Sequence, residues 1–573
     1  MSIAVRTKRP VVAAWLEAHS TAVAPALLGF AMVLASLLLY RKGLGTIFYL
    51  DDWAWFLDRR PWREDIFLVP ESGHLSAVSI LIYKLLFITV GLDDYWVYRL
   101  VLIANHLVCV WLLFVLLHRR VGRALALVGA LPILMLGSGW QNMLLPIQVS
   151  FLIPIAAGLG AWLALDRDDG FGDALAALLL LLAIGSSGVG IVFVGGVLVE
   201  LLTDRARLVR AWVAALPMAV YALWYTEYGE AQLLTGPADQ SLRELVGAQL
   251  PAVPTFAAES AGGALSGLLG LGTEWSRALV VIAAAALVWR LLAIARVSRR
   301  LCSLLAAVAT YLFVLGLFRA GTYNPAESRY IYLGSVLAVL IAAELAAGVR
   351  AARRTLAILA LVAGAAIAGN FKALREGSTQ LQTWSSIVGV EFGALEIAGR
   401  PADENWIVDP VRLSFVRAGA YLDAVEELGS PAMSPAQLAG AYEHHRQVGD
   451  IILLRALGVT LRPGGTPAGA APRPGSVEGR VATDGPCVVV RPMNETAKLD
   501  ASLPVSRVVV ESRAAPVELW LRSFGIYYVE EPFGTVPARG RATLVVPARP
   551  GVGWHVRIAS TGAAALCGVS RTQ

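Results

Sequence analysis

Apolar residues dominate the first 371 positions of the chain and recur in runs separated by short polar connections. A run of about 20 apolar residues has the length that crosses the hydrocarbon core of a bilayer as a helix. The pattern therefore predicts a polytopic α-helical membrane region with about eleven spans. The expected spans are 22–40, 95–117, 124–138, 147–165, 173–186, 189–202, 211–227, 277–293, 302–318, 330–348 and 355–371.

The connections between these runs alternate in charge. Lys and Arg are retained on the cytoplasmic side of a membrane, so the basic connections and the basic N-terminus are expected there. The connections poorer in Lys and Arg, and everything after 372, are then expected on the extracytoplasmic side. The basic set is Arg119/Arg120/Arg123, Arg205/Arg207/Arg210, Arg296/Arg299/Arg300 and Arg350/Arg353/Arg354, and the other set is 41–94, 139–146, 228–276 and 319–329.

Two segments test this topology. Residues 74–92 are apolar, but a crossing there would move Arg119 and Arg120 outside and place Lys84 in the middle of the bilayer. We therefore expect 74–92 to be a helix lying at the outer interface. Residues 173–203 contain a Gly-Ser-Ser-Gly break at 185–188, and two short spans there keep all later basic connections inside.

The composition changes after residue 371. Residues 372–460 favour helices and turns, and 461–480 form a Pro/Gly/Ala-rich linker. From 481 to 573, short β-branched runs recur with turn residues between them, which predicts an extracytoplasmic antiparallel β-sandwich. Cys487 and Cys567 lie in its first and last strands, and an oxidising compartment favours a disulfide between them over two free thiols.

Overall composition supports the membrane class. The chain is 57% hydrophobic and only 16% charged, whereas soluble domains carry about 25% charged residues. Its Lys and Arg fall in short clusters between apolar runs and not on a basic patch with aromatics, which argues against a nucleic-acid partner. The Ala/Gly/Arg-rich usage suggests a high-GC bacterium, so the expected location is the inner membrane.

Candidate chemistry begins directly after the first span. Asp51 and Asp52 are adjacent carboxylates flanked by aromatic residues such as Trp53. A carboxylate held near the interface suits a general base or a metal ligand, although Asp at a helix start is also a common N-cap.

Further polar and aromatic residues occupy the same set of outer connections. Carboxamides hydrogen-bond sugar hydroxyls, aromatic rings stack on sugars, and arginines near lipid headgroups bind phosphate. His74 equally suits a helix cap, and Asp93 and Asp94 equally suit N-caps of the second span. The substrate-binding candidates are Trp53, His74, Asp93, Asp94, Trp140, Gln141, Arg319, Tyr323, Arg329 and Tyr330.

These features together resemble the GT-C superfamily of membrane glycosyltransferases. The group includes protein O-mannosyltransferases, aminoarabinose transferases and arabinofuranosyltransferases. The resemblance covers about 1–371 by architecture: an acidic pair in the first outer loop, an interfacial helix in that loop, about eleven spans and an exported C-terminal domain. Its motifs are Asp51/Asp52 and, more loosely, Gly73-His74 and Arg329-Tyr330.

The resemblance implies a polyprenyl-phosphate-linked sugar as donor and a glycan or protein acceptor in the cell envelope. It implies that Asp51 or Asp52 acts as the base on the acceptor hydroxyl, and that an arginine of the late outer loop neutralises the lipid phosphate. Members differ in metal use, and this chain shows no His-rich ligand set, so a divalent metal stays open. The donor sugar and the acceptor do not carry over.

Two other classes of function stay in view. An O-antigen polymerase or ligase is also polytopic, but it usually centres on Arg and His in a large late outer loop. A non-enzymatic lipid or polysaccharide transporter should show internal repeats and charges at the bilayer midplane, and neither pattern is evident.

Overall fold

A computed structural model describes residues 20–60, 62, 64–70, 73–229, 242–294, 296–349, 351–503, 507–549 and 552–569. The described residues separate into two compact units, and the chain passes between them more than once. Unit 1 comprises Met1–Leu44, Arg59–Val90 and Asp94–Gln382, and unit 2 comprises Gly45–Asp58, Gly91–Asp93 and Thr383–Gln573. The first outer loop is therefore divided between the two units.

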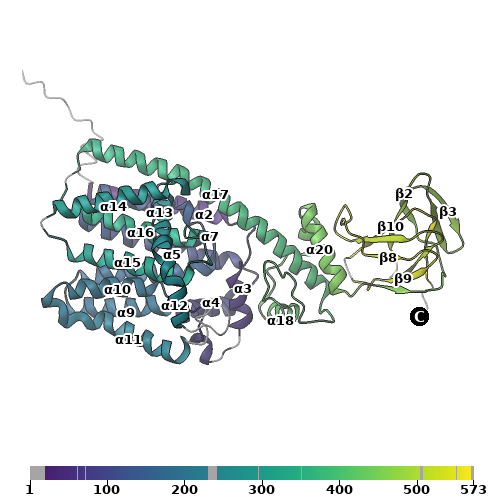
Figure 1. The fold of residues 1–573 in the computed structure, drawn as a ribbon, viewed down its shortest axis with the longest axis horizontal. Coiled ribbons are helices and arrows are strands. Elements are labelled where there is room, and N and C mark those ends of the chain that lie inside the picture. The colour runs from purple at the N-terminus through teal and green to yellow at the C-terminus, as the bar shows by residue number, and fades with distance from the viewer. Residues whose placement is uncertain are drawn as a thin grey trace, which may run out of the picture. The chain divides into compact units, whose positions relative to one another are not determined.

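Unit 1 is a bundle of apolar helices (Figure 1). Among the described residues, eight helices are long and apolar enough to cross a membrane, and α6, α9 and α10 are shorter apolar helices at further expected spans. The expected polytopic helical membrane fold is confirmed. The helices of unit 1 are α2 (Ser20–Lys42), α4 (Ala77–Val90), α5 (Tyr95–Val121), α6 (Arg123–Leu134), α7 (Gln141–Leu144), α8 (Val149–Leu165), α9 (Gly170–Ser186), α10 (Gly190–Leu202), α11 (Trp212–Trp224), α12 (Leu242–Gln249), α13 (Val253–Leu268), α14 (Ser276–Ala293), α15 (Arg299–Arg319), α16 (Ser328–Leu345) and the first part of α17 (Arg353–Ala398).

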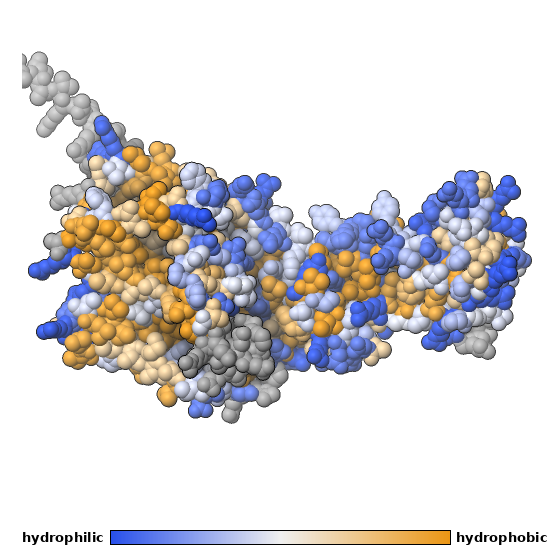
Figure 2. Space-filling view, viewed as in Figure 1, coloured by the Kyte–Doolittle hydropathy of each residue, from blue (hydrophilic) through white to orange (hydrophobic). Residues whose placement is uncertain are grey.

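Much of the face of this bundle seen in Figure 2 is apolar and coloured orange. Helix α14 has no buried side chain, and the residues that it exposes include the large apolar Val281, Trp289 and Leu292. A contiguous apolar surface of this kind is costly in water, but it is the surface that a lipid-facing helix requires. The exposed side chains therefore agree with the membrane class that the hydropathy pattern predicts.

Ion pairs gather at one end of unit 1, which we call the ion-paired end. Here the arginines of three predicted basic connections meet carboxylates at neighbouring helix ends. Arg300 and Glu200 are almost fully buried, so each side chain needs the other. The pairs are Arg119–Asp166 (3.1 Å), Arg120–Glu344 (2.6 Å), Arg207–Asp168 (2.8 Å), Arg299–Asp204 and Arg300–Glu200 (2.8 Å).

The two ambiguous segments form short apolar helices. Helix α4 has 14 residues, a length close to those of α6, α9 and α10, so its place at the outer interface stays a prediction. Its Lys84 is buried by protein, where Nζ donates to the carbonyl of Arg60 at 3.3 Å and lies 4.4 Å from the Trp62 ring centroid. The segment 173–203 divides into α9 and α10, and the Gly-Ser-Ser-Gly break lies at the connection between these two helices.

The expected loop 228–276 contains a helix that the hydropathy pattern did not predict. Helix α13 packs against α14, α15 and α16 through small residues. A Cβ on Gly263 would lie 2.8 Å from the Cβ of Ala326, and a Cβ on Gly267 would lie 2.7 Å from the Ile331 side chain. Gly, Ala and Ser lower the hydropathy of α13 but let helices approach closely, so packing and not hydrophobicity holds this helix.

The boundary expected at 371 lies inside a helix. Helix α17 continues to Ala398, and the units divide between Gln382 and Thr383. The composition becomes polar at this point, but the backbone hydrogen bonds of a helix do not depend on which side chains face lipid. The remaining helices of unit 2 are α3 (Asp51–Asp58), α18 (Ala418–Leu428), α19 (Pro435–Ala439) and α20 (Glu443–Ala456).

The C-terminal part of unit 2 is the expected β-sandwich, with two antiparallel sheets. One sheet has the order β1-β9-β6-β11-β4-β3 and the other β2-β5-β10-β7-β8. The strands are β1 (Thr460–Pro463), β2 (Pro474–Glu478), β3 (Arg480–Asp484), β4 (Cys487–Arg491), β5 (Ala497–Leu503), β6 (Arg507–Ser512), β7 (Val517–Arg522), β8 (Gly534–Val536), β9 (Arg541–Val545), β10 (Trp554–Ser560) and β11 (Ala564–Cys567).

The segment 461–480, expected as a linker, supplies strands to the sandwich. Strand β1 lies at the edge of the first sheet and β2 at the edge of the second. Proline lacks a backbone donor and is tolerated at sheet edges, so a Pro-rich segment can pair on one side only. The Pro and Gly content of this segment predicts turns, and it gives no signal of these two edge strands.

A disulfide joins the two sandwich cysteines. Cys487 in β4 and Cys567 in β11 are directly paired across neighbouring strands, and the structure bonds their sulfur atoms. The bridge closes a loop with a sequence separation of 80 residues. A bridge over a loop of this length restricts the unfolded chain and typically contributes about 2–5 kcal/mol to stability.

We expect mass spectrometry of the non-reduced protein to find Cys487 and Cys567 linked. Cys487→Ser should destabilise the sandwich by about 2–5 kcal/mol, measured as increased hydrogen exchange in β4, β6 and β11. Cys302→Ser is the matched control, because Cys302 is a free thiol in α15. Two free sandwich thiols in the native protein would contradict the expectation.

Candidate functional site

Two arginines share one aromatic ring at the end of unit 1 away from the ion pairs. Arg319 ends α15 and Arg329 lies in the first turn of α16. Each guanidinium carbon lies 5.0 Å from the ring centroid of Tyr323, in the connection between the helices. Within the described residues Arg319 forms no salt bridge with a carboxylate. Two guanidinium groups on one ring concentrate positive charge and favour an anionic ligand.

His74 extends this cluster. Its Nε2 lies 3.3 Å from Nη2 of Arg319. Burial and the neighbouring positive charge of Arg319 lower the pKa of His74 to about 4, so the imidazole is neutral near pH 7. A neutral Nε2 can accept a hydrogen bond from the guanidinium, which leaves Nδ1 to carry the proton.

The glycine break between α9 and α10 makes room for this histidine. A Cβ on Gly188 would lie 2.7 Å from Nδ1 of His74, which is too close for an ordinary contact. Ser79 also donates to the carbonyl of Ser186 at 3.2 Å, so the start of α4 packs against the break. The Gly-Ser-Ser-Gly sequence therefore serves the site as well as the topology.

Gln141 fixes the start of α16. Its Oε1 accepts the backbone N–H of Arg329 at 3.2 Å, and its Nε2 donates to Oε1 of Glu327 at 3.0 Å. Its backbone N–H donates to Oγ of Ser328 at 3.1 Å. One residue thus ties α7 to the residues that carry Arg329, which makes Gln141 a positioning residue in this structure.

The acidic pair lies in unit 2, in the first turn of α3. Asp51 is exposed, whereas Asp52 is completely buried and its Oδ2 accepts the N–H of Tyr49 at 2.9 Å. Leu50, just before the pair, has a φ of 40°, a conformation that a non-glycine residue rarely adopts and that stores strain. The two carboxylates therefore occupy different environments, one facing solvent and one serving the helix start.

Aromatic packing inside unit 2 holds α3. Trp53 is fully buried, stacks on Phe392 at 4.7 Å between ring centroids, and donates its indole N–H to the carbonyl of Phe48 at 2.9 Å. Trp53, a substrate-binding candidate, is a buried core residue in this structure. The sequence alone does not distinguish an interfacial ring from one that fills a core.

The two acids at the end of the first loop have local partners. Asp93 accepts the backbone N–H of Ser430 at 2.7 Å and so holds the chain after α18. Asp94 accepts the indole N–H of Trp96 at 3.1 Å and precedes α5 without a side-chain capping bond. Both acids make structural contacts, and Asp94 is not the side-chain cap that was considered.

Tyr330 and Trp140 are placed by packing. Tyr330 is buried beneath Arg329, 5.4 Å from ring centroid to guanidinium carbon, and its carbonyl accepts the hydroxyl of Tyr311 at 2.7 Å. Trp140 packs over α17, where a Cβ on Gly377 would lie 2.3 Å from the ring. The structure thus brings His74, Gln141, Arg319, Tyr323, Arg329 and Tyr330 into connected contacts within unit 1.

Sequence reasoning missed several residues of this network. Glu327 and Ser328 stand beside Arg329 in the chain, and their adjacency to a predicted arginine was a usable signal. Gly188 and Gly377 act by lacking a Cβ, and nothing in a single sequence separates such glycines from ordinary ones.

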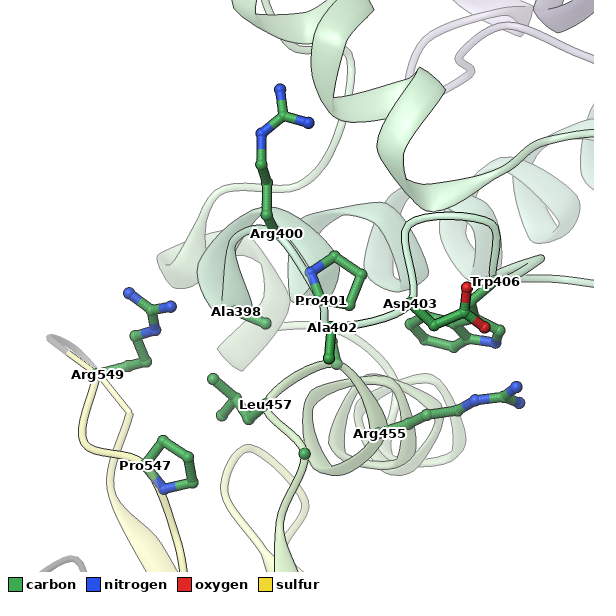
Figure 3. A pocket seen from close by; sticks show the side chains of 12 residues that line it. Ala398, Arg400, Pro401, Ala402, Asp403, Trp406, Arg455, Leu457, Pro547 and Arg549 are labelled. Carbon is green, nitrogen blue, oxygen red and sulfur yellow. The ribbon is translucent and has the colours of Figure 1, made fainter.

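A cavity of about 310 Å³ lies within unit 2 near the end of α17. Figure 3 shows that the guanidinium groups of Arg400, Arg455 and Arg549 point in different directions around it. Arg400 is already paired with Asp423, and Arg455 lies over the Trp406 ring at 4.6 Å. The cavity has positive charge at its rim but no convergent set of donors.

One group within the described ranges has the spacing of metal ligands: Cys487, Glu511 and Cys567. Its two cysteines are joined in the disulfide, which removes both thiolates.

Comparison with solved structures gives a distant structural likeness. No family model matches the chain, and no curated protein matches it. Among solved structures, ArnT from Cupriavidus metallidurans bound to undecaprenyl phosphate aligns with a TM-score of 0.43 and 13% identity, over 71% of this chain and 86% of that chain.

The lowered pKa of His74 predicts a pH dependence of stability. Unfolded His74 binds a proton near pH 6.5, and folded His74 binds it only near pH 4. Stability from this group is therefore complete above pH 6.5 and is lost as the pH falls toward 4, by up to about 1.4 kcal/mol per pH unit.

His74→Gln should remove this slope, because glutamine accepts a hydrogen bond without titrating. Hydrogen exchange of 73–80 and 319–323, compared between variant and wild type at pH 5 and pH 7.5, measures it. Equal ratios at both pH values would contradict a neutral histidine at this place.

The contacts of Gln141 predict a second effect. Gln141→Ala removes the acceptor for the Arg329 N–H and should speed hydrogen exchange in 327–331 by about five- to tenfold, since a lost hydrogen bond costs about 1 kcal/mol. Thr273→Ala, at an exposed position between α13 and α14, is the matched control. Unchanged exchange in the Gln141 variant would exclude the positioning role.

Proposed function

We propose that this protein is a membrane glycosyltransferase that takes a sugar from a polyprenyl-phosphate donor and delivers it to a cell-envelope acceptor. The observation that carries the proposal is the cluster of Arg319, Arg329 and Tyr323 beside a neutral His74. A bilayer protein with concentrated positive charge at one helix end suits a lipid-borne phosphate, which lies at headgroup depth.

The end of unit 1 opposite the ion-paired end carries His74, Arg319 and Arg329, and we call it the His74 end. The proposal assigns it to the extracytoplasmic face of the bacterial inner membrane. The arginine-rich connections support this orientation, because they gather at the ion-paired end and basic connections stay in the cytoplasm. A donor on the outer face must be lipid-linked, since nucleotide sugars are cytoplasmic compounds.

In the proposed reaction, the acceptor hydroxyl attacks the anomeric carbon of the sugar and the bond from that carbon to the phosphate oxygen breaks. Asp51 takes the hydroxyl proton as general base, because it is the exposed member of the acidic pair. Arg319 and Arg329 stabilise the charge that develops on the departing polyprenyl phosphate. Asp52 supports the start of α3 through the Tyr49 N–H.

The His74–Arg319 contact also suits an O-antigen polymerase or ligase, which relies on Arg and His. That class does not need an acid after the first span. The acidic pair therefore discriminates between the two candidate functions.

Asp51→Asn should reduce transfer by about 10²–10⁴-fold while the protein still folds, because the amide cannot take a proton. The measurement is release of polyprenyl phosphate from a lipid-linked sugar by purified protein in nanodiscs. Asp58→Asn, at the other end of the same helix, is the matched control and should retain activity. Full activity of the Asp51 variant would show that Asp51 is not the general base and would favour the O-antigen polymerase or ligase alternative.

A further inference from the structure

A polar cavity of about 370 Å³ opens at the His74 end of unit 1. It is built by the connection before α7, the connection before α16, and one stretch of α17. Its lining residues are Ser138, Trp140, Gln141, Asn324, Ala326, Glu327, Ser328, Ala373, Glu376, Gly377 and Gln380.

Helix α17 supplies one wall with a regular pattern. Ala373, Glu376, Gly377 and Gln380 follow a helical spacing, so they share one face of the helix. The two small residues leave space, and the two long polar ones stand at its border. Trp140 closes against this face at Gly377 and adds an aromatic surface to the lining.

The polar groups that line the cavity are acidic or uncharged. It offers two carboxylates, three carboxamides, two hydroxyls and one indole, and no lysine or arginine is among the described lining residues. One oxygen of Glu327 already accepts from Gln141, and Glu376 is exposed, with Oε1 lying 3.9 Å from Nζ of Lys372. Acceptors therefore outnumber donors, so a bound molecule must donate hydrogen bonds, and an anion would meet two like charges.

We propose that this cavity binds an uncharged, hydroxyl-rich sugar ring and rejects uronic acids. The inference rests on the proposed function, which it deepens by assigning the class of sugar. The Gln141 side chain connects the cavity to the Arg329 backbone, so a sugar held here lies beside the arginine cluster. The sugar can belong to the lipid-linked donor or to the acceptor glycan, since both present the same hydroxyl chemistry.

Saturation-transfer NMR on the full-length protein in nanodiscs tests the proposal without turnover. The probes are methyl α-mannopyranoside, methyl arabinofuranoside and sodium glucuronate. We expect at least one neutral glycoside to bind at least about tenfold more tightly than glucuronate. No binding of either neutral glycoside, or equal binding of glucuronate, would overturn the proposal.

Variants of α17 locate the binding. Ala373→Leu, which fills the cavity, and Gln380→Ala, which removes an amide, should each weaken the neutral glycoside by about tenfold. Arg375→Gln is the matched control, because Arg375 is exposed on the same helix and does not line the cavity. Unchanged affinity in both cavity variants would place the binding elsewhere and overturn the proposal.

Glu376→Gln tests the charge rule with minimal risk to folding, because the side chain is exposed. It should raise the affinity for glucuronate severalfold and leave the neutral glycoside nearly unchanged. If glucuronate affinity does not rise, rejection does not come from this carboxylate and the assignment of specificity fails.

Transfer kinetics then distinguish the two sources of the sugar. A rise in KM for the lipid-linked donor alone in Gln380→Ala assigns the cavity to the donor sugar, and a rise for the acceptor alone assigns it to the acceptor. If neither KM changes, the cavity is not a substrate subsite. If the wild type binds glycosides as expected but releases no polyprenyl phosphate, the proposed function fails, whereas sugar binding in the cavity is still supported.

Discussion

The hydrocarbon core of the bilayer is the constraint on which this structure depends. Backbone groups there must bond within helices, and charged side chains must find partners inside the protein or move to the helix ends. Buried Arg300 meets Glu200, and buried Lys84 finds the carbonyl of Arg60. The polar chemistry of unit 1 is thereby concentrated at two ends, one occupied by ion pairs and the other by the His74 cluster.

The same constraint explains which parts of the fold are predictable. Span positions follow from hydropathy and basic connections, because lipid leaves few alternatives, and both ambiguous segments were assigned on charge alone. The hydropathy pattern did not predict α13, because Gly262, Gly263 and Gly267 contribute little hydrophobicity. These glycines instead allow close contact with neighbouring residues. The change of composition near 371 lies inside α17, which stays helical where its side chains change environment.

The site was predictable in its residue types and not in its contacts. Arg319 and Arg329 stood out as cations in an outer connection, but their common contact with Tyr323 depends on how α15 ends and α16 begins. His74 and Gly188 are far apart in the sequence and meet only in the fold. Asp51 and Asp52 looked equivalent in the sequence, yet Asp52 is buried and Asp51 is exposed. Long-range packing, which a single sequence does not encode locally, decides each case.

The arginine cluster is an arrangement that stability alone would not favour. Two guanidinium groups on one ring repel each other, and burial disfavours charging the histidine beside them. Surrounding contacts hold the arrangement in place: Gln141 binds the Arg329 backbone, Tyr311 binds the carbonyl of Tyr330, and Gly188 admits His74. An anionic ligand carries charge opposite to that of both guanidinium groups. The proposed phosphate therefore suits this end of the bundle, because a lipid-borne phosphate lies at headgroup depth.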